Sequence, residues 1–119
     1  GYVFVYDPVA NMLSLHTSVR DGQIAHGPQP DDPPLFHAPF PADITPAVAR
    51  LRATRQVLIT SAADSPFRWP GTAAWHRAQG NREVAAQALL AGDELVGVLG
   101  LTFRARPPLT SGDTQLIQT

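Results

Sequence analysis

Residues 82–105 read REVAAQALLAGDELVGVLGLTFRA, and this stretch decides the fold. Each half alternates its side chains between two faces with a period of two, which is typical of β-strands. Between the halves, Gly92 and Asp93 favour a tight turn, because glycine tolerates positive φ and aspartate can bond its own backbone. The sequence therefore predicts a long antiparallel hairpin with arms at 83–90 and 95–103.

Both faces of this hairpin are apolar. In the first arm, one face carries Val84, Ala86, Ala88 and Leu90, and the other carries Ala85, Gln87 and Leu89. In the second arm, one face carries Leu95, Gly97, Leu99, Leu101 and Phe103, and the other carries Val96, Val98, Gly100 and Thr102. Strands that are apolar on both faces must be covered on both sides. We therefore expect an α+β fold in which the hairpin is central to an antiparallel sheet of five to six strands, with helices on both faces.

The rest of the chain adds strands and helices around this hairpin. Further strands are expected at 2–6, 12–19 and 56–60, and helices at 46–54, at 71–79 and from Thr110 onward. In the 12–19 strand, alternation predicts that Leu13, Leu15, Thr17 and Val19 face the core and that Ser14, His16 and Ser18 face solvent. Because one of its faces is expected to contact solvent, we place this strand nearer the edge of the sheet.

Prolines and glycines interrupt the pattern between Arg20 and Pro41. Such a composition predicts a long loop without regular structure. Leu35, Phe36 and Phe40 are the side chains that could hold this loop against the body of the domain. We expect a tethered surface loop in preference to a lid over a ligand.

Composition excludes several kinds of function. The 119 residues include nine basic residues, all arginine, ten acidic residues and no cysteine, for a net charge of −1. This balance argues against nucleic acid or a membrane surface as the partner, and the lack of cysteine excludes a thiolate nucleophile. The four histidines show no metal-binding spacing, and no nucleophile or phosphate-loop motif is present. We therefore expect no enzymatic activity, no metal and no cofactor.

The hairpin, followed by Pro-Leu-Thr-Ser-Gly-Asp-Thr-Gln-Leu-Ile at 108–117, resembles the C-terminal half of a GAF domain. The opening Tyr-Val-Phe-Val-Tyr-Asp-Pro at 2–8 looks like the first strand of that family, and Arg-Gln-Val-Leu-Ile-Thr at 55–60 looks like a later one. The resemblance covers nearly the whole chain in order. It implies one GAF- or PAS-like domain over 1–119, which we expect to be a fragment of a larger multidomain protein.

The resemblance also implies a place for a ligand, between the sheet and the segment 61–81. Carried over by position, the walls of the site are Phe67, Trp69, Trp75 and His76, the possible polar contacts are Asp64 and Arg77, and Gln87 is the group that points in from the sheet. Apolar walls with a few polar groups suit a small-molecule pocket. The alternative is that the large aromatic side chains simply fill this space as core.

Two functional expectations follow from this resemblance. The first is a small-molecule-sensing regulatory domain of a cytoplasmic, bacterial signalling protein, such as the sensor histidine kinase of a two-component system. It would bind an unknown small molecule, pass the signal to an attached output domain and form a homodimer. The alternative is a ligand-free module for dimerisation and signal transmission. The chain lacks the cysteine that bilin-binding and methionine-sulfoxide-reducing relatives need, the cyclic-nucleotide signature is not recognisable, and only His76 is placed to ligate haem.

Overall fold

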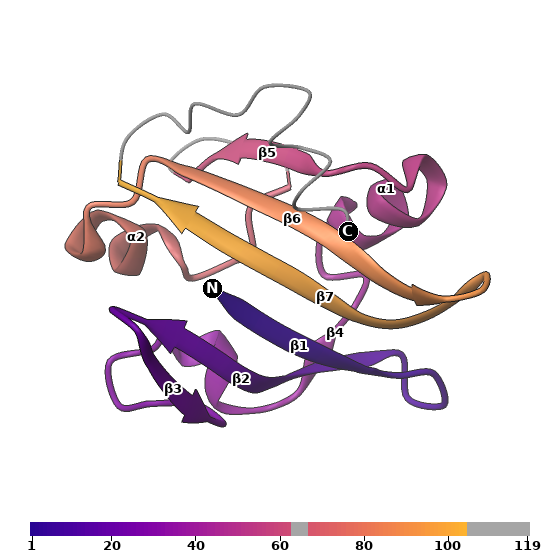
Figure 1. Ribbon diagram of the computed structural model, residues 1–119, viewed down its shortest axis with the longest axis horizontal. Coiled ribbons are helices and arrows are strands. Elements are labelled where there is room, and N and C mark those ends of the chain that lie inside the picture. Colours follow the sequence, from indigo (N-terminus) through magenta and orange to yellow (C-terminus); the bar gives the residue numbers. More distant parts are fainter. Residues whose placement is uncertain (63–66, 105–119) are drawn as a thin grey trace.

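The computed structural model describes residues 1–62 and 67–104, which form one antiparallel sheet with helices packed on it (Figure 1). In chain order, the strands are β1 (Tyr2–Asp7), β2 (Met12–Arg20), β3 (Gln23–His26), β4 (Phe40–Pro41), β5 (Leu58–Ser61), β6 (Glu83–Ala91) and β7 (Glu94–Phe103). The helices are a 3-10 turn, η1 (Pro34–His37), followed by α1 (Ala47–Thr54) and α2 (Ala73–Gln79). The order across the sheet is β3-β2-β1-β7-β6-β5, and β4 pairs with β2. The predicted α+β class and antiparallel sheet are confirmed.

The β6–β7 hairpin lies at the centre of the sheet, as predicted. Its two strands pair from Glu83 opposite Phe103 to Ala91 opposite Glu94. Gly92 adopts a φ of +63° in the turn, a conformation that glycine reaches without steric cost. β1 pairs with the outer side of β7 and β5 with the outer side of β6, so neither arm of the hairpin is an edge. Both arms therefore have a strand on each side.

A bulge in β7 corrects part of the predicted facing. Leu89 pairs with Gly97 and Leu90 pairs with Leu95, so Val96 is an extra residue in β7. Because a bulge shifts the alternation by one residue, Leu95 is 5% exposed and joins Val98 in the core, whereas Val96 is 46% exposed. The expectation that Leu95 shares a face with Leu99 was wrong for this reason.

A second irregularity changes the facing along β2. Val3 pairs with Thr17 and Phe4 pairs with Leu15, so His16 is the extra residue. Leu13 and Leu15 are buried as predicted, but beyond the bulge Ser18 is 4% exposed and Val19 is 45% exposed. The predicted inward position of Val19 and outward position of Ser18 are therefore reversed.

Both described α-helices lie on the same face of the sheet, behind it in the view of Figure 1. α1 begins at Ala47, whose backbone N–H donates to Thr45 Oγ1 at 3.2 Å. α2 is followed by Gly80, which has a φ of +72°, the left-handed conformation that glycine commonly adopts at the end of a helix. The helix predicted from Thr110 falls outside the described residues. Within the described ranges, neither helix has the length and apolar character needed to cross a lipid bilayer.

The segment from Arg20 to Pro41 is more regular than predicted. It contains β3, η1 and β4, because backbone pairing with β2 is available to the short stretches between its prolines. Phe36 and Phe40 are buried in the core and Leu35 packs against it, so the predicted tethering is confirmed.

A buried carboxylate also fixes this segment. Asp32 Oδ1 accepts hydrogen bonds from Arg20 Nη2 at 3.0 Å and from the Tyr2 hydroxyl at 3.4 Å, and Oδ2 accepts one from the Gln29 backbone N–H at 2.7 Å. The Asp32 side chain is 0% exposed, whereas that of Asp31, which pairs with the same arginine, is 56% exposed. Burial and three donors make Asp32 the stronger of the two anchors.

We expect Gly97→Ala to lower the free energy of unfolding by about 1–3 kcal/mol, because a Cβ would overpack the sheet. A Cβ at Gly97 would lie 2.3 Å from the Phe4 backbone oxygen, which cannot move without disturbing β1. Gly100→Ala is the control, because there the nearest atom, the Tyr2 backbone oxygen, is 4.0 Å away. Urea unfolding followed by circular dichroism compares the two variants, and equal losses would contradict the prediction.

We expect Asp32→Asn to destabilise the protein by about 1–3 kcal/mol, since it removes the charge that pairs with Arg20 in a buried position. The neighbouring Asp31→Asn should cost less than about 1 kcal/mol, because an exposed ion pair contributes little. Chemical denaturation of the two variants in parallel measures the loss in the free energy of unfolding for each. A larger loss for Asp31→Asn would show that the exposed pair is the real anchor.

Candidate functional site

A cavity of about 70 Å³ lies between the sheet and the helices. β1 contributes Tyr2 and Phe4 to its wall, and η1 contributes Phe36. The central hairpin contributes Val84, Ala86, Val98, Gly100 and Thr102. α1 closes another side with Val48 and Leu51, and the segment around α2 supplies the remaining wall. Strands of the sheet, both α-helices and η1 therefore all contribute to the wall of this cavity.

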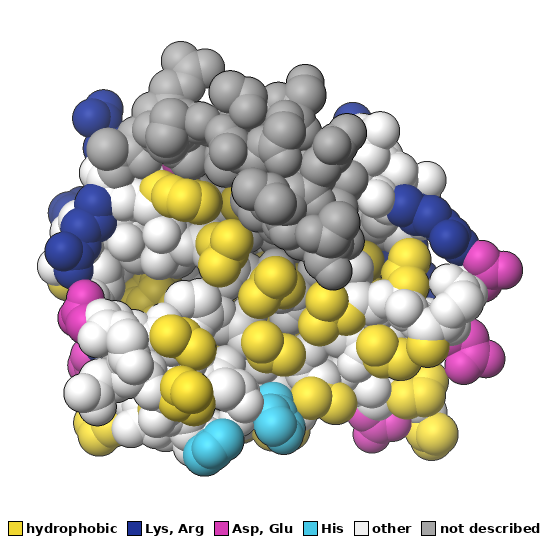
Figure 2. Space-filling view, in the orientation of Figure 1, with side chains coloured by type: hydrophobic (Ala, Val, Ile, Leu, Met, Phe, Trp, Pro, Cys, Tyr) yellow, Lys and Arg dark blue, Asp and Glu magenta, His cyan; other side chains and the backbone are white. Residues whose placement is uncertain are grey.

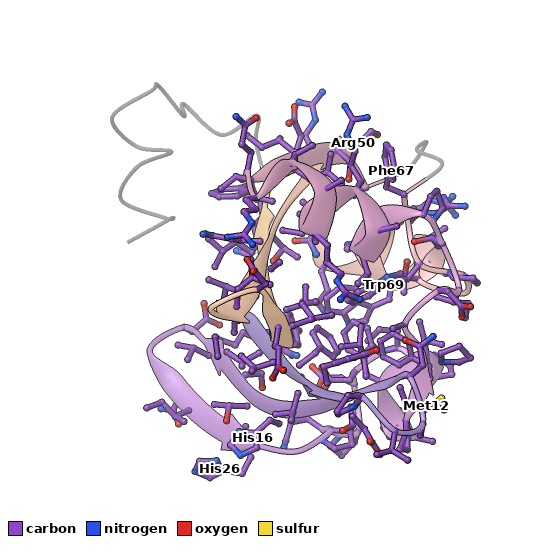
Figure 3. The ribbon with its side chains drawn as sticks, turned by 90° about the vertical axis from the view of Figure 1, so that its right-hand side faces the viewer. Met12, His16, His26, Arg50, Phe67 and Trp69 are labelled. Atoms are coloured by element: carbon purple, nitrogen blue, oxygen red, sulfur yellow. The ribbon has the colours of Figure 1, made fainter. Side chains whose placement is uncertain are left out.

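Aromatic rings make up much of the wall. Phe4 lies 4.9 Å from Trp69 and 5.0 Å from Phe36, measured between ring centroids. Tyr2 lies 5.6 Å from Trp75 and 5.4 Å from Phe36. These contacts are edge-to-face, the geometry that the quadrupoles of aromatic rings favour. Figure 3 shows Trp69 in the layer between the strands and the helices.

Two polar atoms in this wall lack partners. The indole N–H groups of Trp69 and Trp75 are buried and make no hydrogen bond within the described part of the chain. A buried donor left unpaired typically costs about 1–3 kcal/mol, and most buried donors are paired for this reason. Both tryptophans line the cavity. Less than 1 Å² of either nitrogen is accessible, so both donors are enclosed by the packed side chains around them.

His76 contributes a neutral imidazole. Its Nδ1 lies 3.2 Å from Nδ2 of Asn81, an amide nitrogen that can only donate, so the ring proton of His76 is on Nε2. Burial, reinforced by the positive charge of Arg68, lowers the pKa of His76 to about 4. The ring is therefore uncharged at neutral pH.

One charged side chain among the described residues, Arg68, belongs to the wall of the cavity. Thr72 is buried, and its hydroxyl donates to the Trp69 backbone oxygen at 2.6 Å, which holds the chain just before α2. The described wall therefore combines apolar surface with an arginine and a neutral histidine.

Four of the predicted site residues line this cavity, namely Phe67, Trp69, Trp75 and His76. Arg77 is exposed on α2 and is not part of the wall. Asp64 lies outside the described residues. Whether any of them binds a ligand stays a prediction.

Gln87 was expected to point into the cavity, but it is not among the residues of the wall. Its neighbour Ala86 lines the cavity, and because consecutive strand residues face opposite sides, Gln87 lies on the other face of the sheet. Its pairing with Leu99 on β7 agrees with this placement.

Sequence reasoning missed the walls that come from far along the chain. Tyr2 and Phe4 alternate along β1 and therefore share a face, but nothing in the sequence says that this face meets Trp75 and Trp69. Phe36 was expected only as a tether, yet it also lines the cavity. Arg68 lies next to predicted residues, and its position in a run of aromatic residues was the available signal.

The described residues contain no group of three or more His, Asp or Glu side chains arranged to hold a metal ion. His16 and His26 are neighbours, with ring centroids 6.5 Å apart, but they lie on β2 and β3 away from the cavity (Figure 3).

We expect the free energy of unfolding to fall by about 2 kcal/mol between pH 7 and pH 5, because of His76. Its pKa is about 4 in the folded protein and 6.5 in the unfolded chain, so the unfolded state takes up a proton first as the pH falls. The stabilisation is present above pH 6.5 and is lost progressively towards pH 4.

Urea unfolding at both pH values measures this effect. His76→Gln should remove most of the difference, and His26→Gln, at an exposed histidine, should leave it intact. An unchanged pH dependence in His76→Gln would assign the effect to other groups.

Comparison with known proteins identifies the fold. No family model and no curated protein sequence matches the chain. A GAF domain/HD domain protein from Geobacter sulfurreducens is similar in structure, with a TM-score of 0.69 and 19% identity, over 98% of this chain and 71% of that one. The GAF domain of a two-component sensor histidine kinase from Bacillus halodurans is also similar, with a TM-score of 0.65 and 13% identity, over 98% of this chain and 71% of that chain.

A phycocyanobilin-bound GAF domain from a cyanobacterial phytochrome gives a TM-score of 0.59 and 16% identity, over 98% of this chain and 67% of that chain. At such identities the similarity establishes the fold, and it agrees with the element order and the antiparallel sheet described above. The chain has the fold of a GAF domain.

Proposed function

We propose that this chain is a small-molecule-sensing regulatory domain of a bacterial signalling protein, such as a sensor histidine kinase. The ligand would sit between the sheet and the part of segment 61–81 that carries Trp69 and Trp75. The domain itself would be non-catalytic and would act on an attached output domain. This proposal joins the GAF fold to the chemistry of the cavity.

The observation that carries the proposal is the internal cavity between the sheet and the helices, beside which the indole N–H groups of Trp69 and Trp75 stay buried without partners. A packed core of this size would normally pair or avoid such donors. Places where a fold departs from this rule are often functional sites. The GAF domains to which the chain is similar include one from a sensor histidine kinase and one that holds a bilin, which supports a sensory role for this fold.

The walls of the cavity suggest how binding would be transmitted. The cavity borders three parts of the domain: the sheet through Phe4, the Pro-rich segment 20–41 through Phe36, and α1 through Leu51. A ligand that contacts all three stabilises one relative arrangement of these elements over others, which is the requirement for a ligand to shift a conformational equilibrium. The same elements could then alter the contacts of neighbouring domains.

A ligand-free module for dimerisation and signal transmission is the alternative. Its support is the second face of the sheet, where Val5, Ile59 and Val96 are 43%, 39% and 46% exposed. Figure 2 views this face and shows hydrophobic side chains gathered over the middle of the sheet. A homodimer would bury such a surface, and this could happen with or without a ligand in the cavity.

Native mass spectrometry of the freshly purified protein tests the proposal. We expect a mass excess that disappears on denaturation, corresponding to a co-purified small molecule. Trp75→Ala should abolish this excess because it removes a wall of the cavity. His26→Gln, which changes an exposed side chain outside the cavity, is the control and should retain it.

Titration provides the second readout, since the chain has two tryptophans and both line the cavity. Intrinsic fluorescence should therefore respond to any compound that enters. A bare protein mass, together with no fluorescence response to a library of small metabolites, would favour the dimerisation module.

A further inference from the structure

We propose that His16 and His26 form a surface site for a divalent transition-metal ion, which the two imidazoles bind and water molecules complete. The site lies on the β2–β3 hairpin, and neither histidine lines the cavity. It therefore goes beyond the proposed function. The inference follows from the position, the hydrogen bonding and the exposure of the two side chains.

The hairpin brings the two histidines together. Thr17 on β2 pairs with His26 on β3, and the Gly27 backbone N–H donates to the His16 backbone oxygen at 2.9 Å. His16 is the extra residue of the β2 bulge, and bulges commonly change the direction of a side chain. The ring centroids lie 6.5 Å apart, and Figure 3 shows the two rings side by side at this edge of the sheet.

A transition-metal ion can bridge this separation. Zinc–nitrogen bonds are about 2.0–2.1 Å long, so a bound ion lies roughly 3.2 Å from the centroid of each ligating ring. At a tetrahedral ion, the two centroids are then roughly 5 Å apart. The rings of His16 and His26 are slightly farther apart than this. Both side chains are exposed, and exposed side chains change rotamer readily, so the rings can approach each other without movement of the strands.

Thr17 prepares His16 for this role. Its hydroxyl oxygen lies 2.6 Å from His16 Nδ1. With the ring proton on Nδ1 and donated to this oxygen, the lone pair of His16 Nε2 is free for a metal ion. Histidines that bind metals almost always donate their other ring N–H in this way, which fixes the orientation of the ring and raises its basicity.

The ligand set decides which ions fit. Among the residues that the structure describes, no third His, Asp or Glu joins the pair. Imidazole is a good ligand for Zn²⁺, Ni²⁺ and Cu²⁺, whereas Mg²⁺ and Ca²⁺ prefer carboxylate and carbonyl oxygens. Two imidazoles therefore select the transition metals, and Cu²⁺ should bind more tightly than Ni²⁺ or Zn²⁺.

A bound ion would stabilise the edge of the sheet. β3 has four residues and lies at the end of the strand order, next to β2. An ion held by one imidazole from each strand cross-links them. Because the ion binds the folded hairpin in preference to the unfolded chain, it should slow hydrogen exchange of the β3 amides and raise the thermal stability.

Isothermal titration calorimetry of the tag-free protein with NiCl₂ tests the site, at pH 7.5 because metal binding requires neutral imidazoles. We expect one ion to bind per chain. His16→Gln and His26→Gln should each weaken binding at least about tenfold, because the second imidazole of a chelating pair acts at a high effective concentration. His37→Gln is the matched control, since it removes an exposed histidine elsewhere and should leave the affinity unchanged.

Two further measurements locate the ion. Paramagnetic broadening by substoichiometric Cu²⁺ should remove the NMR signals of Thr17 and Gly27 first and leave those of His37. Thr17→Val removes the hydroxyl beside His16 Nδ1 and should weaken Ni²⁺ binding about tenfold, the lower end of the usual cost of removing such a partner.

Equal Ni²⁺ affinity in the wild type and in either single histidine variant would overturn the site, because the ion would then bind one imidazole or another part of the chain. Absence of Ni²⁺ binding to the wild type would overturn it as well. Both histidines are exposed, so the variants should fold, and circular dichroism checks that they do. None of these outcomes bears on ligand binding in the cavity.

Discussion

The packing of other rings around Phe4 is the interaction on which the rest of the structure depends. Phe4 is 1% exposed and belongs to the strand that joins the N-terminal half of the sheet to the central hairpin. Its ring contacts Phe36 and Phe40 from the Pro-rich segment, at 5.0 and 5.8 Å, and Trp69 at 4.9 Å. This one side chain thus contacts two segments that are far apart in the sequence, and each ring contact is worth about 0.5–1.5 kcal/mol beyond its buried area.

Three of these aromatic side chains, Phe4, Phe36 and Trp69, also line the cavity. The indoles of Trp69 and Trp75 bring donors that need acceptors. Their apolar surroundings provide none within hydrogen-bonding distance in the described residues. Both donors are therefore enclosed without a partner, which costs about 1–3 kcal/mol for each of them.

Most of the sheet could be predicted from the sequence because its strands obey simple alternation. The hairpin, β1 and the ends of α1 and α2 followed from periodicity, turn residues and helix-stop signals. The errors came where an extra residue enters a strand, at His16 in β2 and at Val96 in β7. The alternation shifts by one residue there, so residues on the two sides of the bulge were assigned to the wrong faces relative to one another. A bulge depends on the register with a partner strand, which local sequence does not specify.

In the candidate site, too, the sequence does not specify which residues from distant parts of the chain come together. Its tryptophans were predicted because they cluster in sequence, but Tyr2 and Phe36 reach the cavity from distant positions. Gln87 was assigned to the cavity by position, from the resemblance to GAF domains, although its alternation with Ala86 places it on the opposite face.

Tyr2 makes the position of the Pro-rich segment and the shape of the cavity interdependent. Its ring lines the cavity, while its hydroxyl donates to Asp32 and accepts from Arg20 Nη2 at 3.1 Å. Burial raises the pKa of Tyr2, so the hydroxyl keeps its proton and remains a donor. To enlarge the cavity by rotating this ring, the protein would have to break the bonds that hold Asp32. A ligand larger than the existing space must therefore displace both the aromatic wall and its anchor, and for this reason the structure favours a small one.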